Sequence, residues 1–408
     1  MSELSYLEKL LDGAEVEWLP LSSLCNLITT GKLNANAMED NGAYPFFTCN
    51  EEPYRINTYA FDLEAILISG NGSQVGHLNY YNGKFNAYQR TYILGGFNEN
   101  VDIMYLYYYL MHTLKPYIHK NSRKGSVPYI TMPMLENFKF PIPCPNNLEK
   151  SLAIQSEIVR ILDKFTALTA ELTAELNMRK KQYNYYRDQL LSFDEEQEKP
   201  VYLEKLLDGV KVEWKTLEKV LKRTKGTKIT AGQMKDLHKD NAPLKIFAGG
   251  KTVAFVDFKD IPEKDINREP SIIVKSRGII EFEYYDKPFS HKNEMWSYHS
   301  NNDAISIKYI YYFLKINEGY FQKIGGKMQM PQIATPDTDK FEVPIPCPDN
   351  PEKSLAIQSE IVRILDKFDT LTNSITEGLP REIELRQKQY EYYRDLLFSF
   401  PKPETVSN

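Results

Sequence analysis

Cysteine is scarce in this sequence, and long apolar runs are missing. The four cysteines form no Cys-x-x-Cys pair, so their spacing offers neither a zinc site nor a redox motif. No apolar run approaches the roughly eighteen residues of a membrane span, and the N-terminus has no signal-peptide pattern. We therefore expect a cytoplasmic protein in which Cys144 and Cys347, which occupy equivalent places of a repeat, are small buried residues.

The motifs of common catalytic sites are missing as well. The chain has no His-Glu-x-x-His, no Gly-x-Ser-x-Gly and no Asn- or Asp-Pro-Pro-aromatic motif of amino-methylating enzymes. In GNGSQVG (70–76) the third glycine comes one place late for a dinucleotide loop, and a strand-like sequence follows, which favours a hairpin turn. GGKT (249–252) lacks the earlier glycine that a phosphate loop requires. We therefore expect no catalytic residues, no metal site and no cofactor in this chain.

What the sequence does contain is an internal duplication. SLAIQSEIVRILDKF occurs letter for letter at 151–165 and at 354–368. Other repeated segments flank it: YLEKLLDG at 6–13 and 202–209, PIPCP at 141–145 and 344–348, and RKKQYNYYRDQLLSF (179–193), which returns as RQKQYEYYRDLLFSF (386–400). The inserts between them, roughly 20–140 and 215–340, hardly resemble each other. Near-identical frames that hold dissimilar inserts indicate one scaffold with two specificities, and the exact repeat fits a surface that meets the same partner twice.

Charge is distributed unevenly along the chain. The net charge of −5 does not by itself suggest a nucleic-acid partner. Residues 20–140 carry nine basic and nine acidic residues, whereas residues 215–343 carry 22 basic and 17 acidic ones. The frame segments therefore hold the excess of acid. This distribution fits a frame that contacts proteins and inserts that contact a polyanion, although surface solubility explains the first insert equally well.

Both inserts show the pattern of one strand-rich fold. In the first we predict strands at Ala65–Ser69, Gly76–Tyr81 and Thr91–Leu94 and a buried helix at 101–118, whose tyrosines are expected to pack in a core rather than to stack on bases. In the second, SIIVKSRGIIEFEYY and KYIYYFLKINEGYF stand at the corresponding places. The inserts are thus predicted to share a fold but not their surface residues.

After each insert the apolar period becomes helical. The seam predicted along the two long helices consists of Ile154, Ile158, Ile161, Phe165, Leu168 and Leu172, and of Ile357, Ile361, Ile364, Phe368 and Leu371. The first helix carries a duplicated tetrapeptide, TAEL-TAEL (169–176), and some forty residues without Pro or Gly give a rod of about 60 Å. In the second, Gly378 and Pro380 predict a break, with Pro380 in the first turn of a new segment.

Several polar and basic residues of the inserts are of the types that bind base edges or phosphates. Any one of them, taken singly, is more often a solvated surface residue, but their occurrence at equivalent places of both inserts favours DNA. In the first insert, Asn86, Gln89 and Arg90 are expected in one strand-like segment. The full set of candidates is Ser73, Gln74, Asn86, Gln89, Arg90, Arg123, Lys124, Ser126, Lys275, Arg277, Lys292, Asn293, Lys327, Gln329 and Gln332.

The duplicated frame, the dissimilar inserts and the TAEL repeat resemble the specificity (S) subunits of type I restriction-modification enzymes. YLEKLLDG, SLAIQSEIVRILDKF and QYNYYRDQLLSF resemble the type IC branch in particular. The resemblance implies an α+β fold with an internal pseudo-twofold repeat, in which two long antiparallel coiled-coil-like helices separate two strand-rich target recognition domains of mixed α/β type. The implied divisions are 1–18, 19–145 (first recognition domain), 146–193 (central helix), 194–214, 215–348 (second recognition domain), 349–400 (C-terminal helix) and 401–408.

The same resemblance implies a role in a complex. Each recognition domain would read one half of a bipartite, interrupted site in double-stranded DNA, and the helices would set the spacer. Two methylation (M) subunits would dock on the frame, bind S-adenosylmethionine and methylate adenine N6, and motor-nuclease (R) subunits, which use ATP and Mg, would join for cleavage. Two alternatives stay open at this point: a self-contained DNA adenine methyltransferase or nuclease, and a coiled-coil adaptor without a DNA role.

Overall fold

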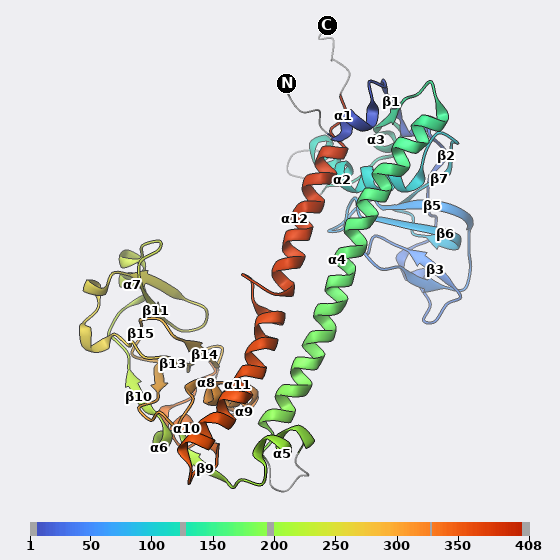
Figure 1. Ribbon diagram of the computed structural model, residues 1–408. Helices are drawn as coiled ribbons and strands as arrows, with labels where there is room; N and C mark the ends of the chain where they lie inside the picture. The colour runs from blue at the N-terminus through green and yellow to red at the C-terminus, as the bar shows by residue number, and fades with distance from the viewer. Residues whose placement is uncertain (1–5, 123–127, 194–199, 327–328, 402–408) are drawn as a thin grey trace. The chain divides into compact units, whose positions relative to one another are not determined.

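The structure is a computed structural model that describes residues 6–122, 128–193, 200–326 and 329–401 (Figure 1). It divides into two compact units. Unit 1 comprises the chain up to Thr173 together with the residues from Glu382 onward, and unit 2 comprises Ala174–Arg381. The division falls inside the long helix α4 (Leu148–Leu191), so each unit contains one insert and parts of two repeated helical segments.

Unit 1 begins with a short frame that brings distant parts of the chain together. Helix α1 (Tyr6–Leu11) leads into β1 (Val16–Pro20), which pairs antiparallel with β8 (Lys139–Pro143) where the insert ends. The end of α12 (Leu379–Leu397) joins the same hydrophobic core through Leu397, Phe398 and Phe400. The indole Nε1 of Trp18 donates to the carbonyl of Pro401 over 2.8 Å. The last described residues of the chain therefore pack in the same unit as its first described residues.

The first insert is a six-stranded sheet with the order β2-β7-β5-β6-β3-β4. Its elements are β2 (Cys25–Thr30), β3 (Tyr44–Phe47), β4 (Tyr54–Ile56), β5 (Phe61–Ser69), β6 (Leu78–Ala87), β7 (Thr91–Phe97), α2 (Ile103–Asn121) and α3 (Met132–Glu136), with 3-10 turns at Leu21–Ser23 and Ala35–Ala37. The predicted strands and helix are confirmed within a few residues at their ends, although β6 is longer than predicted. Tyr105, Tyr108 and Tyr109 of α2 are buried, which confirms that the tyrosines pack in the core.

Unit 2 repeats this plan with shorter strands. Its frame consists of α5 (Val201–Leu207) and of β9 (Val212–Thr216) paired antiparallel with β17 (Glu342–Pro346). The insert divides into two sheets, β10-β16-β13-β14 and β12-β11-β15. Its elements are α6 (Leu217–Val220), β10 (Lys222–Lys225), α7 (Ala231–Leu237), β11 (Leu244–Phe247), β12 (Val253–Val256), β13 (Ser271–Lys275), β14 (Glu281–Tyr285), β15 (Phe289–His291), β16 (Trp296–His299), α8 (Ile307–Ile316), α9 (Glu318–Gly325) and α10 (Thr335–Asp339), with 3-10 turns at Phe258–Asp260 and Glu263–Asp265.

Within each unit two helical segments pack side by side and run in opposite directions (Figure 1). In unit 1 the ring of Phe165 stacks on that of Tyr393 with centroids 5.3 Å apart, while Ile154 and Ile158 share a core with Leu397. In unit 2 Tyr183 and Tyr186 of α4 stack on Phe368 of α11 (Pro351–Asn373), 6.1 and 5.5 Å away. The seam residues are buried or half-buried in both units. The predicted seam omitted Leu162 and Leu365, which are fully buried.

The break in the second long helix lies where it was predicted. Helix α11 ends at Asn373, and α12 begins at Leu379 with Pro380 as its second residue. Gly378 has a φ of +82°, in the left-handed region that favours glycine. Proline is tolerated in a first helical turn because the N–H groups there have no partner within the helix. By contrast, α4 runs through both TAEL units without interruption.

The exactly repeated segment fastens each insert to its helix by the same contacts. The amide oxygen of Gln155 accepts from Asp102 N over 2.9 Å, and its Nε2 donates to Asn100 O over 2.9 Å. Gln358 makes the same pair of bonds to Ser306 N (2.9 Å) and Ala304 O (3.0 Å). Both glutamines are fully buried. Contacts within the chain therefore explain part of the sequence identity between the two copies.

A second duplicated contact lies two turns further along each helix. Tyr108 donates a hydrogen bond of 2.5 Å to Asp163, and Tyr312 does the same to Asp366. Burial raises the pKa of both tyrosines, and the carboxylates raise it further, so both hydroxyls remain protonated donors at neutral pH. These bonds and those of the glutamines hold the same helix face against the insert in each unit.

Candidate nucleic-acid interface

In unit 1 three segments that are distant in the sequence meet at one end of the sheet. Gly70, which follows β5, donates from its backbone N–H to the carbonyl of Arg90 over 2.9 Å. The carbonyl of Gly70 accepts from Ile130 N over 2.9 Å, and the hydroxyl of Tyr92 donates to Ile130 O over 2.8 Å. The turn after β5, the turn before β7 and the segment before α3 thus share one hydrogen-bonded edge.

Unit 2 builds the same junction from different residues. Ser276, which follows β13, donates from Oγ to Glu294 O over 2.7 Å and accepts at its carbonyl from Ile333 N over 3.0 Å. Gly278 N donates to Pro331 O over 2.9 Å, and Arg277 forms an antiparallel bridge with Gln332. We call each junction a three-loop end: in unit 1 it comprises 70–76, 88–90 and 128–131, and in unit 2 it comprises 276–280, 292–294 and 329–334.

The three-loop ends contain most of the described residues that the sequence suggested for DNA contact. Their exposed side chains differ between the units. Two of the hydrogen bonds that hold the loops nevertheless join corresponding residues: Gly70 and Ser276 each donate to the carbonyl of the second loop and accept from the N–H of an isoleucine in the third. Lys292 is half-buried and pairs with Glu294 over 2.8 Å, and half-buried Gln74 donates to Glu51 over 2.9 Å. Those that are exposed to solvent are Ser73, Gln89, Arg90, Arg277, Asn293, Gln329 and Gln332.

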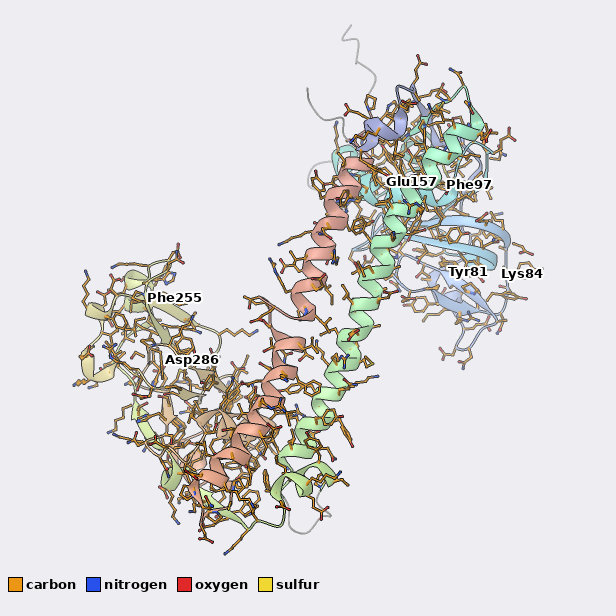
Figure 2. The ribbon with its side chains drawn as sticks, viewed as in Figure 1. Tyr81, Lys84, Phe97, Glu157, Phe255 and Asp286 are labelled. Carbon is orange, nitrogen blue, oxygen red and sulfur yellow. The ribbon has the colours of Figure 1, made fainter. Side chains whose placement is uncertain are left out.

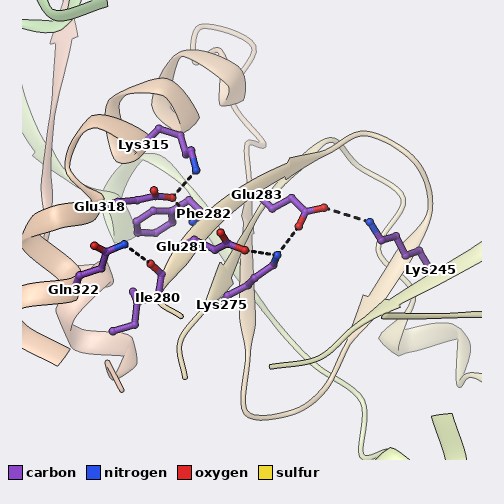
Figure 3. A network of polar contacts seen from close by, with 9 residues as sticks. All are labelled: Lys245, Lys275, Ile280, Glu281, Phe282, Glu283, Lys315, Glu318 and Gln322. Atoms are coloured by element: carbon purple, nitrogen blue, oxygen red, sulfur yellow. Dashed lines mark hydrogen bonds and ion pairs between the residues drawn. The ribbon is translucent and has the colours of Figure 1, made fainter. Parts of the chain in front are cut away.

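Two candidates lack the exposure that a DNA contact needs. Asn86 is buried in β6, where its amide donates to Thr58 and its oxygen accepts from Ala87 N over 3.0 Å. Lys275 is buried at the end of β13, and its ammonium lies 2.6 Å from Glu281 and 2.8 Å from Glu283 (Figure 3). Both have residue types that bind DNA, but they lie in stretches of strand that are buried on both faces.

Other placements refine the expectation. Gln89 and Arg90 lie in the turn between β6 and β7 and not in the strand that contains Asn86. That expectation of one strand-like segment is wrong, since the strand ends at Ala87. Arg123, Lys124, Ser126 and Lys327 lie outside the described residues.

The sequence matches the family model for the "Type I restriction modification DNA specificity domain", and this match identifies the family. The model matches twice, over residues 14–179 and over residues 211–385. The chain belongs to the type I restriction-modification specificity family. Each match contains one complete three-loop end and the frame strands that flank it.

Full-length relatives in this specificity family support the assignment. The chain is 40% identical to the specificity subunit of the type I restriction enzyme EcoR124I/EcoR124II from Escherichia coli, over the whole of both chains. It is 35% identical to the EcoprrI specificity subunit from the same species, covering 92% of this chain and 93% of that one. The fold matches the S subunit of a type I restriction-modification system from M. genitalium with a TM-score of 0.64, at 17% identity and over 96% of this chain and 98% of that one.

Each three-loop end has a neighbouring turn that the sequence pattern missed. In unit 1 the β3–β4 turn adjoins the others, because Cys49 Sγ contacts Asn71 Oδ1 at 3.2 Å and Arg90 O at 3.5 Å. In unit 2 the backbone of the β11–β12 turn, which contains Lys251, approaches Arg277 at Gly249. The GGKT motif thus lies beside the candidate interface, although it fails the spacing of a nucleotide-binding loop. Only the pairing of β3 and β11 with later strands reveals this proximity.

The charge of the buried Lys275 is stabilised by its neighbours. Burial opposes the charge of Lys275, but hydrogen bonds to Glu281 and Glu283 and their charges raise its pKa overall, so the ammonium stays protonated. Among the described residues, no three His, Cys, Asp or Glu side chains gather in a way that could hold a metal ion. Within the same residues, no helix is long and apolar enough to cross a membrane.

Proposed function

We propose that this chain is the non-catalytic DNA specificity subunit of a type I restriction-modification complex, in which each insert reads one half of a bipartite, interrupted site in double-stranded DNA. The observation that carries this proposal is the pair of three-loop ends. Two of their hydrogen bonds join corresponding residues, while their exposed side chains differ. Arg90 and Gln89 in one unit and Arg277, Gln329 and Gln332 in the other are types that bind base edges with paired hydrogen bonds.

The first test is the recognition sequence itself. Modified-base sequencing of DNA methylated by the chain in complex with its methylation subunits should reveal an interrupted motif with two unlike halves. We expect Arg90→Ala to relax one half and Arg277→Ala to relax the other, each by about 1–3 kcal/mol of discrimination. Lys84→Ala is a matched control, because Lys84 is an exposed cation of unit 1 on β6, where the strand register places it opposite Asp62, near the end of β5 that is far from the three-loop end (Figure 2). If either arginine variant alone relaxed the specificity for both half-sites, the proposal that each unit reads its half-site independently would be contradicted.

The frame offers a surface on which a partner would bind twice. In the repeated segment the residues that face away from the insert are Ala153, Ser156, Arg160 and Lys164, and they are exposed. Their spacing of three and four residues places them on one side of α4. The identical residues Ala356, Ser359, Arg363 and Lys367 are exposed on α11. Internal packing explains the identity of the buried side, but it does not explain the identity of this stripe.

We propose that each stripe docks one methylation subunit, which supplies S-adenosylmethionine and transfers the methyl group to adenine N6. In both stripes a glutamate, Glu157 or Glu360, fixes the arginine in a two-pronged ion pair with contacts of 2.6 to 2.7 Å (Glu157 is labelled in Figure 2). A fixed guanidinium loses little side-chain entropy on binding, which suits a protein interface. Motor-nuclease subunits, with ATP and Mg, would join the assembled complex in the bacterial cytoplasm.

Charge reversal tests this docking surface. Arg160→Glu or Arg363→Glu should leave one methylation subunit bound, and the double variant should leave none, as measured by native mass spectrometry. Glu171→Lys is a suitable control, because Glu171 is exposed on the same helix outside the repeated segment. Retention of two methylation subunits by the double variant would exclude the stripes as the docking surface without touching the proposal for DNA reading.

A further inference from the structure

The buried ion network of unit 2 lies at the base of one loop of its three-loop end. Lys275 is the last residue of β13, and its side chain is only 7% exposed. Its Nζ contacts Glu281 Oε1 at 2.6 Å and Glu283 Oε2 at 2.8 Å, and the other oxygen of Glu283 reaches Lys245 on β11 at 3.3 Å (Figure 3). Lys245 in turn lies over the rings of Phe247 and Tyr285, 4.2 and 4.9 Å from their centroids. The network therefore connects the β13–β14 hairpin to the neighbouring sheet.

The strand register explains how this network acts on the loop. Lys275 is directly opposite Glu281, and Glu283 is opposite Ile273, so the three charged groups share one face of the hairpin. The pair of Lys275 and Glu281 thereby closes the loop 276–280 at its base. Arg277 is the second residue of that loop and is exposed. A change in the position of Lys275 would be passed to Arg277 through only one intervening residue.

The fold itself does not require a charged network at this place. The strand registers of the two units can be aligned, because Ile68 is opposite Tyr92 in unit 1 as Val274 is opposite Trp296 in unit 2. The next residue along each strand is Ser69 in unit 1 and Lys275 in unit 2, so Ser69 occupies the place of Lys275. His77 and Asn79 occupy the places of the two glutamates, and the corresponding loop has seven residues, 70–76, instead of five. A hairpin of the same fold thus forms without the network.

Burying an ammonium group costs free energy that its partners must offset, and apolar residues of similar volume often stabilise a core at least as well. A network that the fold can omit, placed under the one exposed arginine of the loop, therefore points to positioning rather than to stability. A single fixed geometry is what paired hydrogen bonds to a base edge require, since they tolerate little displacement.

We propose that Lys275 is a positioning residue for DNA reading: through Glu281 and Glu283 it fixes the loop 276–280 so that Arg277 meets its base in one orientation. This inference rests on the proposed function. The specificity for the half-site read by unit 2 would then depend on Lys275, a residue that does not contact DNA. Lys275 is buried beneath the loop that contains Arg277, which fits this indirect role. It also predicts that the half-site read by unit 1 is independent of the network.

The test uses the complete complex with its methylation subunits and measures methylation of cognate sites and of sites with one altered base pair in either half. Lys275→Met should reduce discrimination by about tenfold at the position read by Arg277 and leave the other half-site unchanged. Lys275→Arg should retain most of the discrimination. Lys245→Met is the matched control at the far end of the network, and it should have a smaller effect, because it leaves both contacts of Lys275 in place.

Loss of stability is separated from loss of positioning by a charge-neutral double variant. Lys275→Met with Glu281→Gln leaves Glu283 paired with Lys245, and it should recover the melting temperature without recovering discrimination. If discrimination returns together with stability, or if Lys275→Met keeps full discrimination, the positioning role is wrong. A wild-type complex that shows no sequence preference in either half would instead overturn the proposed function itself.

Discussion

Replacement of Gln155 by Leu tests the contact that fastens the first insert to its helix. The side chain is fully buried and satisfies Asp102 N and Asn100 O at the start of α2. Leu has a similar volume but leaves both backbone groups without a partner, at about 1–3 kcal/mol for each, so we expect unit 1 to lose about 2–6 kcal/mol of stability. Gln155→Glu should cost at least as much, because a carboxylate oxygen would then face the carbonyl of Asn100.

Hydrogen exchange measured by mass spectrometry reports on each unit separately. In Gln155→Leu the peptides of α2 and of the first part of α4 should lose protection, while those of α8 and α11 keep it. Gln358→Leu should give the mirror image, since Gln358 makes the equivalent bonds to Ser306 and Ala304. Ser156→Leu is the control, because Ser156 is exposed on the same helix. A loss below about 0.5 kcal/mol, or an equal loss in both units, would refute the role assigned to these glutamines.

Three further predictions follow from single features. Insertion of a third TAEL tetrapeptide into α4 should lengthen the helix by about 6 Å and change the spacer of the DNA site by one or two base pairs, while both half-sites stay the same. A methylome with an unchanged spacer would rule out that α4 sets the spacer length. Gly378→Ala should destabilise unit 2 by about 1–3 kcal/mol in urea unfolding, because its Cβ would collide with Thr370 O in a left-handed backbone, and Gly209→Ala, with the same strain but open space, should cost less. Burial lowers the pKa of His291 from its usual 6.5, although the carbonyl of Lys292 and the carboxylate of Asp265 favour the charged form. The contribution of His291 to the stability of unit 2 is therefore complete above pH 6.5, and it falls at lower pH by up to about 1.4 kcal/mol per pH unit. His291→Gln should flatten this pH dependence of stability, and an unchanged slope would contradict the prediction.

The frame could be predicted from the sequence in some detail, because identical segments and a steady helical period leave few choices. The break at Gly378 and Pro380 followed from two residues whose backbone preferences are strong. The burial of Leu162 was missed, because the insert packs on a second side of the helix that a simple seam does not include. The repeated segment was interpreted as a surface for a partner, but Gln155 and Asp163 show that half of it serves the chain itself.

The candidate interface was harder to predict, because it depends on contacts between segments far apart in the chain. Residue type alone selected Asn86 and Lys275, which lie in stretches of strand that are buried on both faces. Arg90 and Arg277 could be named, but not the hydrogen bonds that bring their loops to corresponding places. Those bonds join residues 18 to 60 positions apart, and no local pattern in the sequence indicates them.

The exchange of helical segments between the two repeats has a consequence for how such proteins can arise. Each unit combines an insert and the first part of its own helix with the last part of the helix from the other repeat. A gene that encoded a single repeat would therefore leave its helix end without a partner, and two copies of that product would complete each other as a symmetric dimer. Such a dimer would carry the same reading loops twice, and its target would be a palindrome. Duplication and fusion would then have freed each half to acquire a different target.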